Sequence, residues 1–132
     1  SKRTNDAGIE TLRNLLTHLG HELRIIDIPT EKALHLTSIS STPTDQVILT
    51  AEGFLSADDF GELPEGSQII FLPEEEVYGC NTIGLGNGKV LVAEGYPTVL
   101  ETVQELGLEP IVLDMSQIRE ADGSITCCTL FF

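Results

Sequence analysis

The chain has 132 residues, of which 41% are hydrophobic and 21% charged, and this composition fits one soluble globular domain with a real core. Its formal net charge of −14, from 21 acidic and 7 basic side chains, argues against nucleic acid or an anionic membrane as a partner. No apolar run approaches the roughly eighteen residues of a membrane span, and no basic segment precedes an apolar stretch as in a signal peptide.

The first elements predicted along the chain are a helix and two or three strands. A helix begins at Asn5 or Asp6 and ends at Gly20, because apolar residues recur between them at helical spacing. A strand-like run over residues 23–28 follows and stops before a proline. A new strand is expected near His35, and residues 46–50 form its partner.

The same order of elements then recurs. A short helix over 56–63 precedes a strand over 68–72, and a new strand opens at Asn81. A hairpin turn that ends in Gly88 leads to its partner strand over 89–93.

The third occurrence of this order of elements has the clearest sequence signals. A helix starts at Pro97, whose fixed φ suits a helix start, and Gly107 ends it. A strand over 110–115 and a polar loop lead to a final apolar strand that opens at Cys127.

The residues that open the three new strands are evenly spaced. From His35 to Asn81 and from Asn81 to Cys127 the distance is 46 residues each time. A fixed period marks a repeat architecture, although any α/β protein alternates such elements and coincidence is the alternative. Units of roughly 1–50, 51–93 and 94–132, with strands inward and helices outward, would form an α/β fold of the partial propeller type. The three residues would then meet near its axis.

Cys127 and His35 suit nucleophilic chemistry. A thiolate is a strong nucleophile, and a nearby imidazole can take the thiol's proton and later protonate a leaving group. The alternative is that each residue belongs to the core, since a cysteine in an apolar strand is ordinarily a small buried hydrophobe. Adjacent strand residues face opposite ways, so Cys127 would look toward the centre and Cys128 would pack in the core with Leu130. Asn81 is expected to hold backbone groups in place.

The three cysteines give no sign of a disulfide or a metal. Their odd number and the lack of an export signal indicate a reducing compartment, which for this chain means the cytoplasm. No CxxC pair occurs, and the cysteines and the three histidines match no standard zinc-ligand spacing. The sequence therefore predicts no metal site.

Four segments resemble the dimethylarginine dimethylaminohydrolases, a family of the guanidino-modifying (pentein) superfamily. They are SKRTN at 1–5, LHLTS at 34–38, the segment around Asn81, and MSQIREADGSITCCTLFF at the end of the chain. The resemblance implies ββαβ units of a five-bladed α/β propeller, of which this chain would be about half. It also implies hydrolysis of Nω-methylated arginine to citrulline and methylamine or dimethylamine, without metal or organic cofactor.

The resemblance assigns roles to four residues. Cys127 matches the nucleophile and His35 the general acid and base. Arg3 matches the arginine that helps to hold the substrate's carboxylate, and Ala121 the residue whose backbone contacts the amino acid end of the substrate. A small cationic guanidino substrate also suits an acidic protein, because the field of the protein attracts it.

The family's N-terminal half, with the acids that grip the guanidinium and orient the histidine, has no counterpart here. We therefore expect the N-terminal edge of the chain to pair with an upstream segment, a separate chain or a second copy. Two other functions stay open: an arginine deiminase or amidinotransferase reaction, and a half that binds a protein partner without catalysis.

Overall fold

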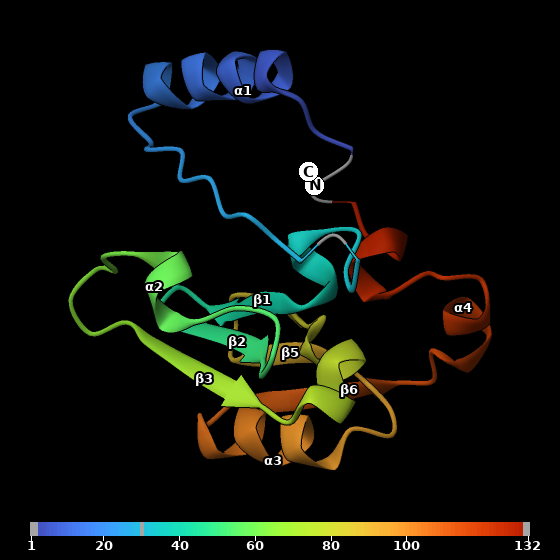
Figure 1. The fold of residues 1–132 in the computed structure, drawn as a ribbon. Helices are drawn as coiled ribbons and strands as arrows, with labels where there is room; N and C mark the ends of the chain where they lie inside the picture. Colours follow the sequence, from blue (N-terminus) through green and yellow to red (C-terminus); the bar gives the residue numbers. More distant parts are fainter. Residues whose placement is uncertain (1–2, 30, 131–132) are drawn as a thin grey trace.

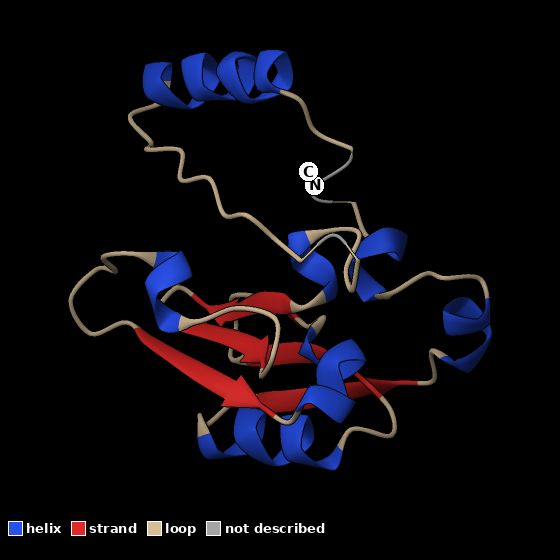
Figure 2. Ribbon diagram, viewed as in Figure 1, coloured by secondary structure: helices blue, strands red, loops and turns tan. Residues whose placement is uncertain are grey.

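A computed structural model describes residues 3–29 and 31–130, which form an α/β fold with two three-stranded sheets and helices around them (Figures 1 and 2). In chain order the elements are α1 (Asp6–His18), η1 (Leu36–Ser38), β1 (Ser40–Thr44), β2 (Val47–Ala51), α2 (Ala57–Phe60), β3 (Gln68–Leu72), η2 (Glu74–Cys80), β4 (Ile83–Gly84), β5 (Lys89–Ala93), α3 (Pro97–Glu105), β6 (Glu109–Leu113), α4 (Ser116–Glu120) and η3 (Ile125–Cys128), where η marks 3-10 helices. Within these described ranges no helix is long and apolar enough to cross a membrane.

The two sheets are copies of one arrangement. In the first, β2 pairs antiparallel with β1 and parallel with β3, and α2 connects the parallel strands. In the second, β5 pairs in the same way with β4 and β6, and α3 makes the connection. The α/β class is as predicted, and the structure contains two ββαβ units. Corresponding strands of the two units begin at residues 40 and 83, 47 and 89, and 68 and 109, so they are 41 to 43 residues apart.

The turn after the middle strand is also repeated. Residues 51–54 read AEGF and residues 93–96 read AEGY. The amide of Glu52 donates to the carbonyl of Leu72 at 2.8 Å, and the amide of Glu94 donates to that of Leu113 at 2.9 Å. Gly53 and Gly95 both have positive φ, at 75° and 94°, a conformation that favours glycine. One aromatic side chain, Phe54 or Tyr96, therefore follows the same turn in each unit.

One hydrophobic core joins the two units. Its buried members come from β2, β3, η2, β5 and α3, and they include Leu49, Cys80, Val90 and Val103, each fully buried. This cluster takes residues from both sheets, and two smaller buried clusters lie beside it. One includes Ile39, Leu55 and Phe60 near the first sheet, and the other includes Ile83, Met115 and Ile125 near the second.

The two sheets approach each other closely at β1 and β4. The hydroxyls of Ser41 and Thr82 are hydrogen-bonded at 2.7 Å. A Cβ atom on Gly84 would lie 2.1 Å from the carbonyl oxygen of Pro43, so only glycine fits there. This contact fixes how one sheet sits against the other.

The N-terminal segment departs from the prediction in part. α1 begins as predicted, and the amide of Gly8 donates to the Asn5 side chain at 2.9 Å, which caps the helix. However, α1 lies apart from the sheets (Figure 1), and its Leu15 and Leu19 are 56% and 64% exposed. The predicted strand over 23–28 is wrong, because these residues run extended without the ladder of hydrogen bonds that a strand needs.

The predicted strands at the three site positions are also wrong. His35 precedes η1, Asn81 follows η2 and Cys127 lies within η3, so none of the three opens a strand. Cys128 is exposed and Leu130 is 86% exposed, in contrast to the predicted core positions. In a 3-10 turn the side chains do not alternate as in a strand, and Ile125, 2% exposed, is the residue that η3 buries.

Candidate active site

His35, Asn81 and Cys127 line one cavity of about 430 Å³, although 46 residues separate each from the next. The ends of η1, η2 and η3 bring them together. The remaining lining residues are Lys32, Leu34, Ser38, Tyr78, Arg119, Asp122, Gly123 and Ser124. The cavity therefore combines a thiol, an imidazole and several polar and charged groups.

Asn81 ties the walls of this cavity together. It is 1% exposed, and its side-chain amide donates to the carbonyl of Thr37 in η1. The same amide nitrogen lies 2.9 Å from the hydroxyl of Thr126 in η3, and the amide N–H of Thr126 donates to Asn81 Oδ1 at 3.0 Å. One buried side chain thus bridges the segment that follows His35 and the segment that carries Cys127.

The three thiols differ in their surroundings. Cys127 is exposed, and its Sγ lies 3.4 Å from the hydroxyl of Ser124, whose side-chain and backbone hydrogen bonds hold the thiol's pKa below its ordinary value. Cys80 is fully buried, and burial, with the nearby carboxylate of Glu76, raises its pKa to about 12. Cys128 is exposed like Cys127. Cys127 is therefore the thiol whose surroundings favour the reactive thiolate.

His35 is exposed and occupies the position before η1, where its carbonyl accepts the amide of Ser38 at 3.1 Å. It also lines a second cavity of about 580 Å³ between α1 and residues 23–28. His35 and Cys127 both line the first cavity, and in the described part of the chain no hydrogen bond joins them.

Reasoning from sequence missed three residues at this cavity. Lys32 and Arg119 place positive charge at it, and Tyr78 donates its hydroxyl to the carbonyl of Gly123 at 2.8 Å. A sequence signal existed for Arg119 alone, since it lies in the polar loop before Cys127. Lys32 and Tyr78 reach the cavity only through tertiary packing.

Arg3 and Ala121 are not among the residues that line the cavity, as far as the described ranges extend. Arg3 lies before α1 and is exposed. Ala121 follows α4 and directly precedes the lining residue Asp122, whose φ of 57° is unusual for a residue other than glycine. The roles of both residues stay predictions.

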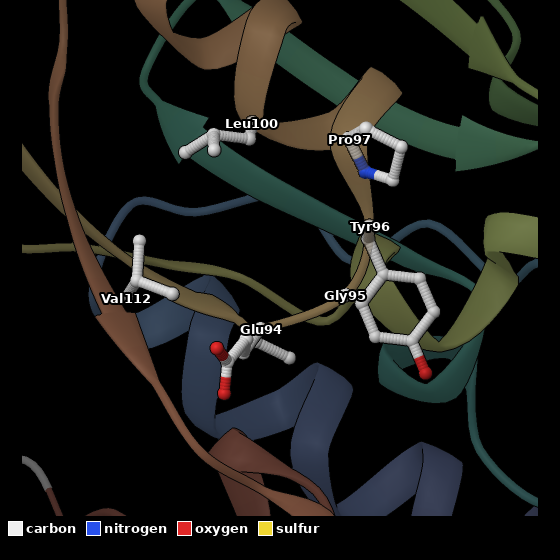
Figure 3. A pocket seen from close by; sticks show the side chains of 7 residues that line it. Glu94, Gly95, Tyr96, Pro97, Leu100 and Val112 are labelled. Carbon is white, nitrogen blue, oxygen red and sulfur yellow. The ribbon is translucent and has the colours of Figure 1, made fainter.

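A further hollow of about 320 Å³ lies beside the start of α3 (Figure 3). It is lined by Ala93, Glu94, Gly95, Tyr96, Pro97, Leu100 and Val112. It holds no nucleophile or imidazole, so it is a poorer candidate for catalysis. Among the described residues no three metal-ligating side chains gather into a possible metal site.

Comparisons with known proteins find relatives that share one name, dimethylarginine dimethylaminohydrolase. No family model matches the chain. It is 33% identical over 132 residues to the dimethylarginine dimethylaminohydrolase of Pseudomonas aeruginosa, covering 100% of this chain and 49% of that protein. It is 31% identical over 129 residues to the enzyme of the same name from Streptomyces coelicolor, covering 97% of this chain and 46% of that protein.

Solved structures agree with this relation. A dimethylarginine dimethylaminohydrolase variant, solved as an adduct with S-methyl-L-thiocitrulline, matches with a TM-score of 0.78 and 31% identity over 98% of this chain and 48% of that one. An amidinotransferase from Microseira wollei matches with a TM-score of 0.81 at 24% identity, over 96% and 38% of the two chains, which shows a shared fold.

The chain spans about half the length of the curated relatives that it matches. The relation covers nearly every residue of this chain, and it appears in sequence and in fold. The chain is homologous to the dimethylarginine dimethylaminohydrolases, and its fold is the α/β fold of those enzymes and of the amidinotransferases.

Proposed function

We propose that this chain carries the nucleophile and the acid/base group of a hydrolase that converts Nω-methylated arginine to citrulline and methylamine or dimethylamine. The observation that carries the proposal is the meeting of His35, Asn81 and Cys127 at one cavity. The homology to dimethylarginine dimethylaminohydrolases supports it from a second direction. A lowered thiol pKa at Cys127 supports the choice of nucleophile.

In the proposed reaction the Cys127 thiolate attacks the guanidinium carbon of the substrate and forms a C–S bond. His35 donates a proton to the departing nitrogen, so that the C–N bond breaks and methylamine or dimethylamine leaves. The product of this step is a covalent thiouronium on Cys127. Water then attacks the same carbon after His35 takes one of its protons, the C–S bond breaks, and citrulline is released with the thiolate restored.

The substrate's amino acid end is proposed to be held by the Arg3 guanidinium, which pairs with the carboxylate, and by the backbone of Ala121. The net charge of −14 supports a cationic substrate, since the field of the protein raises its local concentration. Asn81 acts as a support, because its three hydrogen bonds hold the two walls of the cavity.

The carboxylates that would grip the guanidinium are proposed to come from a polypeptide segment that packs on α1 and residues 23–28. Two features support this. The apolar side chains of Leu15, Leu19 and Ile25 are 51% to 64% exposed. In both ββαβ units the strand after the helix pairs parallel with the strand before it. Residues 23–28 follow α1, and within the described ranges no strand pairs with them. A segment that supplies this strand would also border His35 through the cavity beneath α1.

Citrulline formation from asymmetric dimethylarginine and from arginine, measured with the chain in its natural polypeptide or complex, tests the proposal. We expect turnover of the methylated substrate, loss of turnover in Cys127→Ser, and near-normal turnover in Cys128→Ser. The second variant is a matched control, because both thiols are exposed and adjacent. Loss of activity in Cys128→Ser with retention in Cys127→Ser would refute the assignment of the nucleophile.

The same assay distinguishes the other functions. Activity on arginine alone would indicate a deiminase, and transfer of the amidino group to an added amine would indicate an amidinotransferase. No turnover together with no labelling of Cys127 by an electrophilic amidine would leave a binding role without catalysis.

A further inference from the structure

We propose that Arg119, held against Tyr78 and Tyr96, positions the loop that carries Cys127. It would act as a positioning residue and not as a catalytic one. Its importance for turnover rests on the proposed function, whereas its effect on the Cys127 thiol can be measured without any substrate.

Arg119 is fixed by aromatic rings. Its guanidinium carbon lies 5.0 Å from the ring centre of Tyr78 and 5.9 Å from that of Tyr96, within the range of cation–π attraction. Its Nη1 donates to the Tyr96 hydroxyl at 2.7 Å. The two rings lie 5.7 Å apart, so they support each other as well as the guanidinium. In the described part of the chain no carboxylate forms an ion pair with Arg119, so the aromatic rings are its main partners.

The same cluster holds the backbone just before the nucleophile. Tyr78 donates its hydroxyl to the carbonyl of Gly123 at 2.8 Å. Gly123 follows Asp122, whose φ of 57° is a conformation that neighbouring contacts must maintain. The next residue is Ser124, whose hydroxyl lies 3.4 Å from the Cys127 sulfur. A continuous path of contacts therefore runs from Arg119 through Tyr78 to the thiol.

The other repeat unit has a counterpart to this cluster. Phe54 occupies the position of Tyr96 in the repeated AEGF and AEGY turns, and the Lys32 ammonium lies 5.1 Å from its ring centre. Lys32 and Arg119 both line the cavity of Cys127. In each unit the aromatic residue after the middle strand thus contacts a cation at the cavity wall. The Glu74 carboxylate also pairs with Lys32 at 3.0 Å, so the two cations are held differently.

Labelling of the thiol tests the proposal directly. In a Cys128→Ser background, iodoacetamide meets Cys127 as the exposed thiol, because Cys80 is buried and its pKa is about 12. The rate of labelling is measured against pH. The titratable and charged groups that share the cavity with Cys127 are Lys32, His35, Tyr78, Arg119 and Asp122, and a change of any one could shift this profile.

Two variants that conserve charge isolate positioning from electrostatics. Tyr78→Phe keeps the ring and removes the bond to Gly123, and Arg119→Lys keeps the charge and loses the planar group that stacks on the tyrosines. We expect both to move the labelling midpoint upward by about half a unit to one unit, which means roughly three- to tenfold less thiolate at neutral pH. Arg13→Lys on α1, an exposed arginine paired with Glu10, is the matched control and should label as the parent does.

A parent-like profile in a folded Arg119→Lys variant would overturn the proposal, whatever Tyr78→Phe does. Circular dichroism establishes that each variant is folded, and if Tyr78→Phe does not fold, the arginine variant alone decides. The proposed function can fail independently: a chain without turnover on methylarginine can still show the shifted labelling profile, and a chain with turnover can lack it.

Discussion

Replacing Asn81 with alanine should destabilise the protein strongly. The side chain is 1% exposed and makes three hydrogen bonds, to the Thr37 carbonyl, the Thr126 hydroxyl and the Thr126 amide. At about 1 kcal/mol for each bond, the free energy of unfolding should fall by about 3 kcal/mol. The loss cannot be confined to one element, because the bonds join η1 to η3 across the cavity.

The assay is urea and thermal unfolding followed by circular dichroism, with Asn87→Ala as the matched control. Asn87 is exposed and accepts one hydrogen bond, from the amide of Lys89 at 3.2 Å, in the turn between β4 and β5. We expect the control to lose less than about 1 kcal/mol. For a chain of this size, a loss of about 3 kcal/mol corresponds to a fall of roughly 10 °C in Tm.

Equal and small losses in the two variants would refute the reasoning. They would mean that water or other contacts replace the bonds of Asn81, and that this residue does not hold the walls of the cavity. If Asn81→Ala loses much of its free energy of unfolding but Cys127 is labelled at an unchanged rate, Asn81 stabilises the fold without affecting the thiol.

Three further changes have defined outcomes. Glu76→Gln should lower the free energy of unfolding by about 1 to 3 kcal/mol in urea melts, because the buried carboxylate accepts three hydrogen bonds at the start of α3. Ser124→Ala should move the pH profile of Cys127 alkylation to higher pH, because it removes the side-chain hydrogen bond that lowers the thiol's pKa; an unchanged profile would contradict that cause. Gly84→Ala should lower Tm by several degrees, since its Cβ would meet the Pro43 carbonyl at 2.1 Å; a Tm equal to that of the parent would mean that the two sheets can move apart without cost.

Local sequence signals predicted most of the regular elements of the two complete units. The strands over 68–72 and 89–93 were predicted with the bounds that the structure gives them, and Pro97 marks the first residue of α3. These segments carry their signal locally, in apolar residues bounded by turn residues. The α/β class of the fold follows from their alternation, and the comparisons agree with it.

The errors lie where structure depends on partners rather than on local pattern. Residues 23–28 are as apolar as a strand, but a strand forms only where a second strand supplies hydrogen bonds. Cys128 and Leu130 were predicted to alternate with Cys127 on a strand, yet the bonds of Asn81 hold this segment as a 3-10 turn. No local signal predicts a turn whose main partner lies 45 residues away.

The strands and the site residues repeat along the chain with different spacings. Strand starts repeat after 41 to 43 residues, whereas His35, Asn81 and Cys127 repeat after 46. His35 lies before the first sheet, Asn81 between the two sheets and Cys127 after the second, so all three are outside the strands, where insertions do not disturb strand pairing. Their meeting depends on buried contacts such as those of Asn81, together with the tyrosine–arginine cluster. The repeat brings the three segments near one another, and these few side chains set the geometry in which the proposed chemistry takes place.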